Sequence, residues 1–482
     1  MQSSVLFQDI PYTGTLPSLE VTAVTNDSRR VQPGSVFVCT VGRSFDGHNY
    51  AAKALENGAA LVVSERPLGL GPREVCVENG RKAYAELCGA FFGHPGRQLR
   101  LVAVTGTNGK TTVTTLIKQI LEADGHRCGQ IGTIHTMIDT MELPAKYTTP
   151  EAWDLQMLLA KMVASGCDVA VMEASSQALD QLRLHGLHFE CGVFTNLTQD
   201  HLDYHGDMES YFAAKASLFA HCDTVIYNKD DAWACRLPAL YPHKRCVSFS
   251  AGDDTADFTA RNVELGAGGV RFALVGDRSI QRIRFGMPGA FSVHNAMAAA
   301  LVGLQMGVPS DLVARALQNS HGVRGRCEVL YHGAFTVICD YAHTGDGIEK
   351  ILSSLRPFAQ GRLVALFGCA GQRDAAKRPQ MAAAVLRYAD SIVLTSDNPR
   401  REDPQAIIDQ VEPLLRAGGK PYLVEVERRR AVRAALEQLA DGDVLVLCGK
   451  GHEDYQVIDG VTIYLDEHRI VQDWLREKGL IA

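Results

Sequence analysis

The apolar residues of this 482-residue chain occur in short runs separated by amphipathic stretches. Runs rich in Val, Ile and Leu alternate with segments of helical periodicity, a pattern typical of parallel strands connected by helices rather than of a β-sandwich. We therefore predict an α/β protein built on parallel sheets. The runs that carry this prediction are LRLVAVTG, DVAVMEA, CGVFTN, TVIYN, RLVALFG, SIVLTS and DVLVLCG.

Two segments interrupt this pattern and predict domain boundaries. Residues 91–98 (FFGHPGRQ) are rich in Gly and Pro, and residues 321–328 (HGVRGRCE) place two Gly and two Arg after an amphipathic helix. The length of the chain favours about three domains. We predict that these domains span residues 1–98, 99–328 and 329–482.

Polar clusters follow the predicted strands at the points where the strands end. In parallel sheets, ligands bind beyond the carboxyl ends of the strands, where helix N-termini also converge. One central and one C-terminal sheet are therefore expected to carry sites. The clusters are ASSQ after DVAVME, LTQDHLD after GVFTN, GQRD after VALFGCA, DNPR after IVLTS and KGHE after VLVLC.

The segment VAVTGTNGKTT (102–112) predicts a phosphate-binding loop between a strand and a helix. Its glycines let backbone N–H groups turn toward phosphate oxygens, its lysine can reach the terminal phosphates, and Thr111 can ligate Mg²⁺. Val104 stands where the general P-loop has its first Gly, so this is the shorter GTNGKT form. The expected nucleotide-binding residues are Gly106, Thr107, Asn108, Gly109, Lys110, Thr111 and Thr112.

One lysine lies on the apolar face of a predicted helix. Lys215 follows Met208 by seven residues and shares the face of Tyr211, Phe212 and Phe219. Removal from water lowers the pKa of a lysine, and a neutral amine can react with carbon dioxide to form a carbamate. The alternative is that Lys215 extends along the helix edge to water.

Composition narrows the classes of function. A net charge of −7 gives no support for a nucleic-acid or anionic-membrane partner, and the basic run 428–430 fits the solvated edge of an amphipathic helix. The N-terminus lacks the pattern of a signal peptide, and no apolar stretch approaches the length of a membrane span. The 13 Cys are scattered and odd in number, as expected of reduced thiols in the cytoplasm.

An ordered set of motifs over nearly the whole chain resembles the Mur ligase family. The set is GTNGKT, MEASS (172–176), TNLTQDHLDYHGDMESYFAAK (195–215), GRCE (325–328), DYAHT (340–344), DNPR (397–400) and GKGHE (449–453). The resemblance implies an N-terminal UDP-sugar domain, a central ATPase domain and a C-terminal Rossmann-like domain. It also implies a cytoplasmic monomer that acts in peptidoglycan synthesis. The implied substrates are small molecules: ATP, a UDP-muramoyl-dipeptide and a diamino acid.

The implied reaction is phosphorylation of the dipeptide's D-Glu γ-carboxylate by ATP, then attack of an amine on the acyl phosphate. The catalytic residues that the resemblance implies are Lys110, Glu173, His201 and Lys215. Thr111, Glu173, His201 and Lys215, the last as a carbamate, are the implied Mg²⁺ ligands. For His201 the alternative is a helix-start residue beside two aspartates.

The resemblance also implies further substrate contacts, at positions that match the family's motifs. The implied ATP contacts outside the loop are Asn295, Arg326 and Asp340; a helix N-cap is the alternative for Asn295. The implied UDP-muramoyl-peptide contacts are Ser28, Arg43, Ser44, Phe45, Thr148, Thr149, Ser175, Gln181 and Arg183. Without the resemblance, such Ser, Thr and Gln residues are equally expected as caps in turns.

The implied amino acid is meso-diaminopimelate, which carries one carboxylate more than lysine. A guanidinium holds a carboxylate by two parallel hydrogen bonds, which favours Arg400 as its partner; the alternative for Arg400 is a plain Asn-Pro turn. The implied contacts are Arg373, Asp397, Asn398, Pro399, Arg400, Gly449 and Glu453. The alternatives for the whole chain are the same ligase using L-lysine, a folylpolyglutamate-synthase-like ligase, and a binding protein without catalysis, suggested by departures such as Gly345 in DYAHTGD.

Overall fold

The structure is a computed structural model that describes residues 1–42, 45–266, 268–276, 279–320, 322–373 and 375–481. The chain divides into two compact units, and each is described by itself. The first unit comprises Met1–Phe258 and Ala298–Val313, and the second comprises Thr259–Met297 and Ala314–Ala482. Each unit contains a sheet of mainly parallel strands covered by helices, so the predicted α/β class is confirmed.

The first unit begins with a four-stranded parallel sheet in the order β1-β2-β3-β4. Its apolar strands are buried on both faces, with helix α3 against one face and α2 against the other. The elements are α1 (Ser3–Leu6), β1 (Ala23–Thr25), β2 (Ser35–Val38), α2 (Ala51–Glu56), β3 (Leu61–Ser64), β4 (Glu74–Cys76) and α3 (Gly80–Phe91).

The same unit holds eight strands of an eleven-stranded sheet, in the order β12-β11-β10-β5-β9-β6-β7-β8, and these eight are called the central sheet. Strands β12 to β6 run parallel and the last two antiparallel. The neighbours of β5 are β10 and β9, so the residues that follow these three strands meet at one edge. The strands are β5 (Arg100–Thr105), β6 (Cys128–Ile131), β7 (His135–Ile138), β8 (Met141–Pro144), β9 (Val169–Glu173), β10 (Phe189–Phe194), β11 (Cys222–Asn228) and β12 (Arg245–Ser250).

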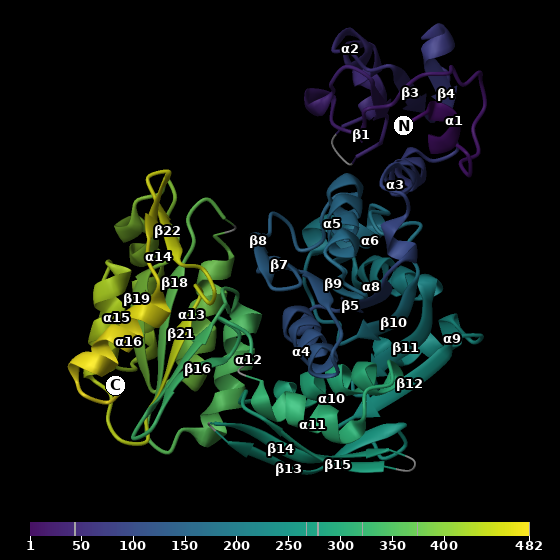
Figure 1. Ribbon diagram of the computed structural model, residues 1–482. Helices are drawn as coiled ribbons and strands as arrows, with labels where there is room; N and C mark the ends of the chain where they lie inside the picture. Colours follow the sequence, from purple (N-terminus) through teal and green to yellow (C-terminus); the bar gives the residue numbers. More distant parts are fainter. Residues whose placement is uncertain (43–44, 267, 277–278, 321, 374, 482) are drawn as a thin grey trace. The chain divides into compact units, whose positions relative to one another are not determined.

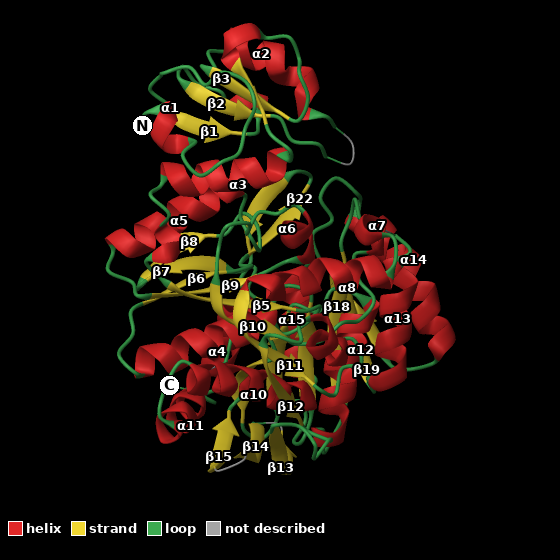
Figure 2. Ribbon diagram, turned by 90° about the vertical axis from the view of Figure 1, so that its right-hand side faces the viewer, coloured by secondary structure: helices red, strands yellow, loops and turns green. Residues whose placement is uncertain are grey.

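Helices cover this sheet where the apolar pattern predicts them. Helix α4 (Lys110–Ala123) buries Val113, Leu116, Ile117 and Ile120 on one face and ends before Gly125, as predicted. Helix α5 lies beside α3 (Figure 2), where Phe91 and Trp153 stack with ring centroids 5.0 Å apart. The remaining helices are α5 (Ala152–Ala164), α6 (Ser176–Asp180), α7 (Leu202–His205), α8 (Met208–Ala216) and α9 (Leu237–Leu240).

The second unit contains an antiparallel meander and a six-stranded sheet in the order β16-β17-β21-β18-β19-β20. Only β16 runs antiparallel in the six-stranded sheet, among the strands described. Helices α15 and α16 cover one face, and α12 and α13 the other (Figure 1). The strands are β13 (Phe258–Gly266), β14 (Gly269–Gly276), β15 (Ser279–Phe285), β16 (Glu328–His332), β17 (Thr336–Asp340), β18 (Leu363–Cys369), β19 (Ser391–Ser396), β20 (Tyr422–Val424), β21 (Val444–Cys448), β22 (Tyr455–Ile458) and β23 (Val461–Tyr464).

The helices of the second unit include two that cross its boundary with the first, α10 and α11. Short 3-10 turns occur in both units, among them Ser28–Arg30 and Ser217–His221. The helices are α10 (Ala290–Gln305), α11 (Ser310–Asn319), α12 (Gly345–Leu355), α13 (Lys377–Tyr388), α14 (Pro404–Gly418), α15 (Arg428–Glu437) and α16 (Glu467–Glu477).

The structure confirms one expectation drawn from composition and corrects another. All thirteen cysteines are free thiols, as predicted. The basic run at the start of α15 was predicted to be solvated throughout, and this is wrong for its first residue: Arg428 is 0% exposed, whereas Arg429 and Arg430 are exposed. Among the described residues, no helix combines the length and apolar character needed to cross a membrane.

Candidate active site

The phosphate loop lies between β5 and α4 and depends on two glycines. Gly106 (φ 142°) and Gly109 (φ 86°) adopt backbone angles that L side chains rarely take. A Cβ at Gly106 would also lie 2.0 Å from Thr195 Oγ1. Thr111 and Thr112 follow in the first, buried turn of α4, where the helix N-terminus favours anions.

The segment after β10 fixes this loop in place. Thr195 Oγ1 donates to the carbonyl of Asn108 over 2.6 Å, and Asn196 Oδ1 accepts from the Asn108 N–H over 3.0 Å. Thr107 Oγ1 donates to the carbonyl of Thr198 over 3.2 Å. The curled backbone that could hold phosphates is therefore pre-shaped by the neighbouring strand.

The Nζ atoms of two lysines converge on one carbonyl of the loop. Lys110 Nζ lies 3.0 Å and Lys215 Nζ 2.8 Å from the carbonyl oxygen of Gly106. Lys215 is 2% exposed and packs with Nζ 4.7 Å from the centroid of the Tyr211 ring. The prediction that Lys215 occupies the buried face of its helix is confirmed, and the alternative that it reaches water along the helix edge is wrong.

The environment of Lys215 favours the neutral amine. Burial lowers its pKa well below the ordinary value, and the charge of Lys110 lowers it further, while Asp200 opposes this in part. A neutral amine is the nucleophilic form of lysine. A buried lysine with a lowered pKa therefore lies beside the phosphate loop.

Glu173 ends β9, one strand over from the loop, and is 0% exposed. Its two oxygens accept from the N–H and the hydroxyl of Thr133, over 2.8 and 3.0 Å. Thr133 was not predicted from the sequence, where the Gly before it was the available indication. In the structure, a Cβ at Gly132 would lie 2.5 Å from Glu173 Oε1. Glu173 is thus a buried carboxylate satisfied only by neutral donors among the described residues, which suits a cation ligand.

The predicted muramoyl-peptide residues of the central sheet form one network with Glu173. Thr148 Oγ1 lies 3.0 Å from Thr133 Oγ1, and Thr149 Oγ1 donates to the Glu173 carbonyl over 2.7 Å. The Ser175 N–H donates to Thr149 Oγ1 over 3.0 Å, and Ser175 Oγ caps α6. The cap expected of such residues in turns is therefore present at Ser175.

Gln181 and Arg183 lie in the turn after α6 and bind each other. Arg183 donates to Gln181 Oε1 over 2.7 Å, to the Thr149 carbonyl over 2.9 Å, and pairs with Glu151 at 2.6 Å. Gln181 Nε2 donates to Tyr204 Oη over 3.1 Å. The structure brings these two residues together with Thr149.

His201 lies at a helix start beside an aspartate, as its alternative describes, and its role as a metal ligand stays a prediction. It stands at the start of α7 with φ 52°, and its Nε2 lies 3.5 Å from Asp200 Oδ2. Its ring is 6.1 Å from that of Tyr211, which also contacts Lys215. Burial lowers the pKa of His201, Asp200 opposes this, and Lys110 and Lys215 lower it further, so the neutral, metal-binding form is favoured.

Within the described part of the chain, no three His, Cys, Asp or Glu side chains gather closely enough to hold a metal by themselves. Mg²⁺ commonly binds through one or two carboxylates together with substrate phosphates. Glu173 and Thr111 at adjacent strand ends are consistent with such an incomplete set.

The N-terminal residues follow neighbouring parallel strands. Ser28 lies in the 3-10 turn after β1, and Phe45 lies after β2 with a half-exposed ring. Arg43 and Ser44 lie outside the described residues.

Two of the predicted nucleotide residues of the second unit, Arg326 and Asp340, lie beside Tyr341. The guanidinium of Arg326 lies 4.8 Å from the Tyr341 ring. Asp340 accepts from the N–H groups of Cys327 and Ala342, each over 2.7 Å; burial raises its pKa and Arg326 opposes the shift. Asn295 is buried inside α10, so the alternative that it is a helix N-cap is wrong.

The predicted amino-acid residues gather at the carboxyl ends of β19 and β21. Asn398 Nδ2 donates to Glu453 Oε2 over 3.1 Å, and Tyr341 Oη donates to Glu453 Oε1 over 3.3 Å. Lys450, which sequence reasoning missed, is 0% exposed and donates to Asn398 Oδ1 over 2.7 Å and to Glu453 Oε2 over 3.0 Å. Its position inside the GKGHE motif was the available signal.

A tight crossing joins this cluster to the loop after β18. Arg400, with φ 57°, donates through Nη1 to the Gly371 carbonyl over 2.8 Å. A Cβ at Gly371 would lie 2.0 Å from the Pro399 carbonyl oxygen, and one at Gly449 would lie 2.7 Å from Asp397 Oδ2. Arg373 follows in the same loop with an exposed side chain. The Asn-Pro turn thus exists and holds Arg400 in a defined place.

Comparisons with known proteins agree with this arrangement. Family models match residues 20–89 (Mur ligase family, catalytic domain), 104–303 (Mur ligase middle domain) and 325–451 (Mur ligase, glutamate ligase domain). A curated relative from Geobacillus thermodenitrificans, named UDP-N-acetylmuramoyl-L-alanyl-D-glutamate--2,6-diaminopimelate ligase, is 41% identical over 95% of this chain and 96% of its own.

Solved structures extend the likeness to the fold. A structure of a UDP-N-acetylmuramoyl-L-alanyl-D-glutamate--2,6-diaminopimelate ligase matches with a TM-score of 0.73 and 32% identity, covering 95% of both chains. The Mycobacterium tuberculosis folylpolyglutamate synthase shares only the fold, with a TM-score of 0.62, 19% identity, and coverage of 75% of this chain and 91% of its own. Since the family models together span most of the sequence and the relative matches from end to end, this chain belongs to the Mur ligase family.

Proposed function

We propose that this chain is an ATP-dependent ligase that joins meso-diaminopimelate to the D-Glu γ-carboxylate of UDP-N-acetylmuramoyl-L-alanyl-D-glutamate in peptidoglycan synthesis. The observation that carries the proposal is the end-to-end match to a relative of that name. We place the reaction in the cytoplasm, where free cysteines stay reduced, and expect the enzyme to act as a monomer.

ATP is the substrate that the loop from Gly106 to Thr112 suits. Backbone N–H groups and the N-terminus of α4 would hold its phosphates, and Lys110, now on loop carbonyls, would turn to them. Asn295, Arg326 and Asp340 are the proposed contacts to the rest of the nucleotide and to its phosphates.

Mg²⁺ fits the donors on this edge of the central sheet. Thr111, Glu173, His201 and a carbamate on Lys215 would hold it, and the bound ion would neutralise charge on the phosphates during transfer. We propose the carbamate because Lys215 is buried beside Lys110 without an ion pair to a carboxylate among the described residues. Its nitrogen attacks the carbon of CO2, one C=O electron pair moves to oxygen, and the nitrogen loses a proton.

The sugar-peptide would run from the N-terminal sheet to Glu173. Ser28 and Phe45, with Arg43 and Ser44 between β2 and Phe45, are the proposed contacts to the UDP part. Thr148, Thr149, Ser175, Gln181 and Arg183 are the proposed contacts to the muramoyl peptide, and their hydrogen-bonded network with Glu173 supports this.

The diamino acid is assigned to the ends of β19 and β21. Arg400 would bind the distal carboxylate that distinguishes diaminopimelate from lysine, and Glu453 the distal ammonium. The Gly371 carbonyl keeps Arg400 in one orientation, which lowers the entropy cost of binding. Arg373, Asp397, Asn398, Pro399 and Gly449 complete the proposed set.

We propose a reaction in two steps. A γ-carboxylate oxygen attacks the terminal phosphorus of ATP, the bond to ADP breaks, and an acyl phosphate forms. The amine of the diamino acid attacks the acyl carbon, phosphate leaves, and the nitrogen loses a proton. Lys110 stabilises negative charge during the first step.

Phosphate release tests the function directly. The purified protein, with ATP and Mg²⁺, should release phosphate only when both the UDP-muramoyl-dipeptide and meso-diaminopimelate are present, and much more slowly with L-lysine. Release that depends on lysine in preference to diaminopimelate would overturn the amino-acid assignment, and ATP binding without turnover would overturn the enzyme assignment.

A further inference from the structure

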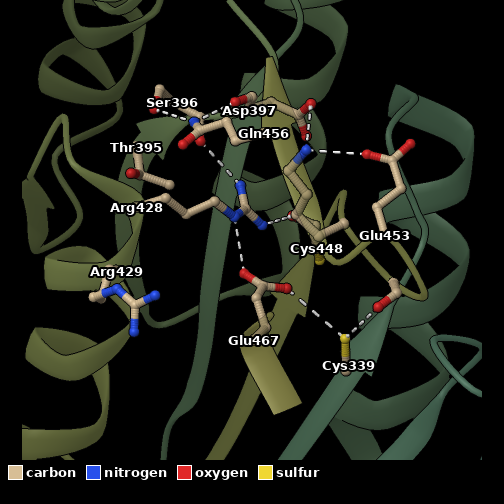
Figure 3. Close-up of polar contacts among 12 residues, drawn as sticks. Cys339, Thr395, Ser396, Asp397, Arg428, Arg429, Cys448, Glu453, Gln456 and Glu467 are labelled. Carbon is tan, nitrogen blue, oxygen red and sulfur yellow. Dashed lines mark hydrogen bonds and ion pairs between the residues drawn. The ribbon is translucent and has the colours of Figure 1, made fainter. Parts of the chain in front are cut away.

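Beneath the proposed amino-acid site lies a buried arginine that the proposed reaction does not use. Arg428 opens α15, and its side chain extends to the ends of the central strands of the C-terminal sheet, whereas Arg429 points away (Figure 3). Its Nη1 donates to the Ser396 carbonyl over 3.2 Å and its Nη2 to the Cys448 carbonyl over 2.8 Å.

The two carbonyls belong to the last residues of β19 and β21, which are not neighbours in the sheet. Strand β18 lies between them. The next residue after each carbonyl is Asp397 in one case and Gly449 in the other. One guanidinium therefore ties together the starting points of the two loops that we assign to the diamino acid.

A second buried charge fixes the guanidinium. Glu467, the first residue of α16, is 0% exposed and accepts from Arg428 Nε over 2.8 Å. Cys339 Sγ donates to the other oxygen of Glu467 over 3.8 Å (Figure 3). With all three sides of the guanidinium occupied by acceptors on three elements, its orientation is set.

The arginine also lies near a buried carboxylate oxygen of the site. Asp397 Oδ2 is buried and has no hydrogen-bond partner among the described residues. A Cβ at Gly449 would lie 2.7 Å from this oxygen and 3.8 Å from Arg428 Nη2, so the two groups flank Gly449. Asp397 directly follows β19, so a shift of that strand end relative to Gly449 would change the position of this oxygen.

We propose that Arg428, held by Glu467, is a positioning residue for diamino-acid binding: it sets the spacing of the Asp397–Arg400 loop and the Gly449–Glu453 turn. The inference rests on the proposed function. Arg428 touches no substrate in this account and acts through the two strand ends, because a binding site loosened by a fraction of an ångström loses affinity.

A second arginine in the same sheet supplies a matched control. Arg362 precedes β18 and pairs with Asp443, which precedes β21, at 2.7 Å. This ion pair joins the amino ends of two strands, away from the ends that carry Asp397 and Gly449. A variant at Arg362 therefore removes an arginine from the same sheet without changing the spacing at the site.

The test compares KM values for diaminopimelate and for ATP. Replacing a buried ion pair by two apolar residues preserves folding in many proteins, so the double variant Arg428→Met/Glu467→Met is the main probe. We expect it to melt as the wild type does, to raise the KM for diaminopimelate about tenfold or more, and to leave the KM for ATP unchanged. Arg362→Met should keep the wild-type KM for diaminopimelate.

A folded double variant with the wild-type KM for diaminopimelate would overturn the proposal, as would an equal rise in both KM values. If the double variant does not fold, the Arg428→Lys variant tests the proposal, because one ammonium group cannot reach both carbonyls. An unchanged KM for diaminopimelate in Arg428→Lys would overturn the proposal. Failure of the proposed function is distinct: the wild type itself would then show no diaminopimelate-dependent phosphate release.

Discussion

Lys215 and Lys450 are both buried lysines, and their surroundings give them different chemistry. Lys215 in helix α8 donates to one neutral carbonyl, with a second lysine nearby. Lys450, in the turn after β21, donates to Asn398 and Glu453 and lies 3.9 Å from Asp397. Burial is equal, but the counter-charges are not.

The difference shows that the charge state expected of a buried lysine depends on its partners. A charge removed from water must be paired or must be given up, because desolvation costs several kcal/mol per ion. Lys450 is paired and serves as a cation that holds Asn398 and Glu453 in place. Burial and the charge of Lys110 lower the pKa of Lys215, so we propose that Lys215 is the reactive amine of the two.

The largest expected effect breaks the paired lysine. Lys450→Met leaves Glu453 and Asp397 without their cation and should lower the free energy of unfolding by about 3–5 kcal/mol. Denaturant titration measures this. Lys350→Met, which removes a surface pair with Asp346, should cost less than about 1 kcal/mol. Equal losses in the two variants would contradict the role given to Lys450.

The unpaired lysine should behave in the opposite way. Lys215→Met removes no ion pair, so we expect stability to be kept while kcat falls on the order of 10²-fold or more, since a proposed metal ligand is lost. Denaturant titration and phosphate release on the same preparation measure both. A variant that loses stability as Lys450→Met does, yet keeps its kcat, would reverse the comparison.

A variant at Arg400 tests whether the residues around Lys450 select the amino-acid substrate. Arg400→Met should reduce the preference for diaminopimelate over lysine by about 10- to 100-fold, because hydrogen bonds from a charged group contribute about 1.5–3 kcal/mol each. The ratio of kcat/KM values for the two amino acids measures it. Arg401→Met, at the exposed neighbouring position, should leave the ratio unchanged; an unchanged ratio for Arg400→Met would remove Arg400 from specificity.

The smallest effect concerns a histidine next to the start of β16. Burial lowers the pKa of His468, but its hydrogen bond to Glu328 at 2.6 Å and the charge of Glu328 outweigh this and raise it above 6.5. A raised pKa gives stability that is complete below the unfolded-state pKa and is lost as the pH rises through the folded-state pKa.

His468→Gln should therefore cost more stability at pH 6 than at pH 9, by a difference on the order of 1 kcal/mol. Urea titrations at the two pH values measure this difference. His188→Gln, which removes an exposed pair with Asp223, is the control and should show no such dependence. A cost for His468→Gln that is larger at pH 9 would have the wrong sign.

The sequence predicted most strongly where local pattern and chemistry coincide. The phosphate loop, the parallel strands and the buried face that holds Lys215 follow from glycine spacing and periodicity, and the structure has them. The boundaries at 98 and 328 and the roles of the site residues stay predictions. Arg428 and Thr133 were missed for a physical reason: their partners, Glu467 and Glu173, are about 40 residues away and only tertiary packing brings them together.

The central claim is that Lys215 reacts as a neutral amine while Lys450 remains a cation. ¹³C NMR of the protein equilibrated with ¹³C-bicarbonate tests it most directly. We predict one carbamate resonance that disappears in Lys215→Met and remains in Lys450→Met. An active wild-type enzyme without such a resonance, or a resonance that survives in Lys215→Met, would contradict the account.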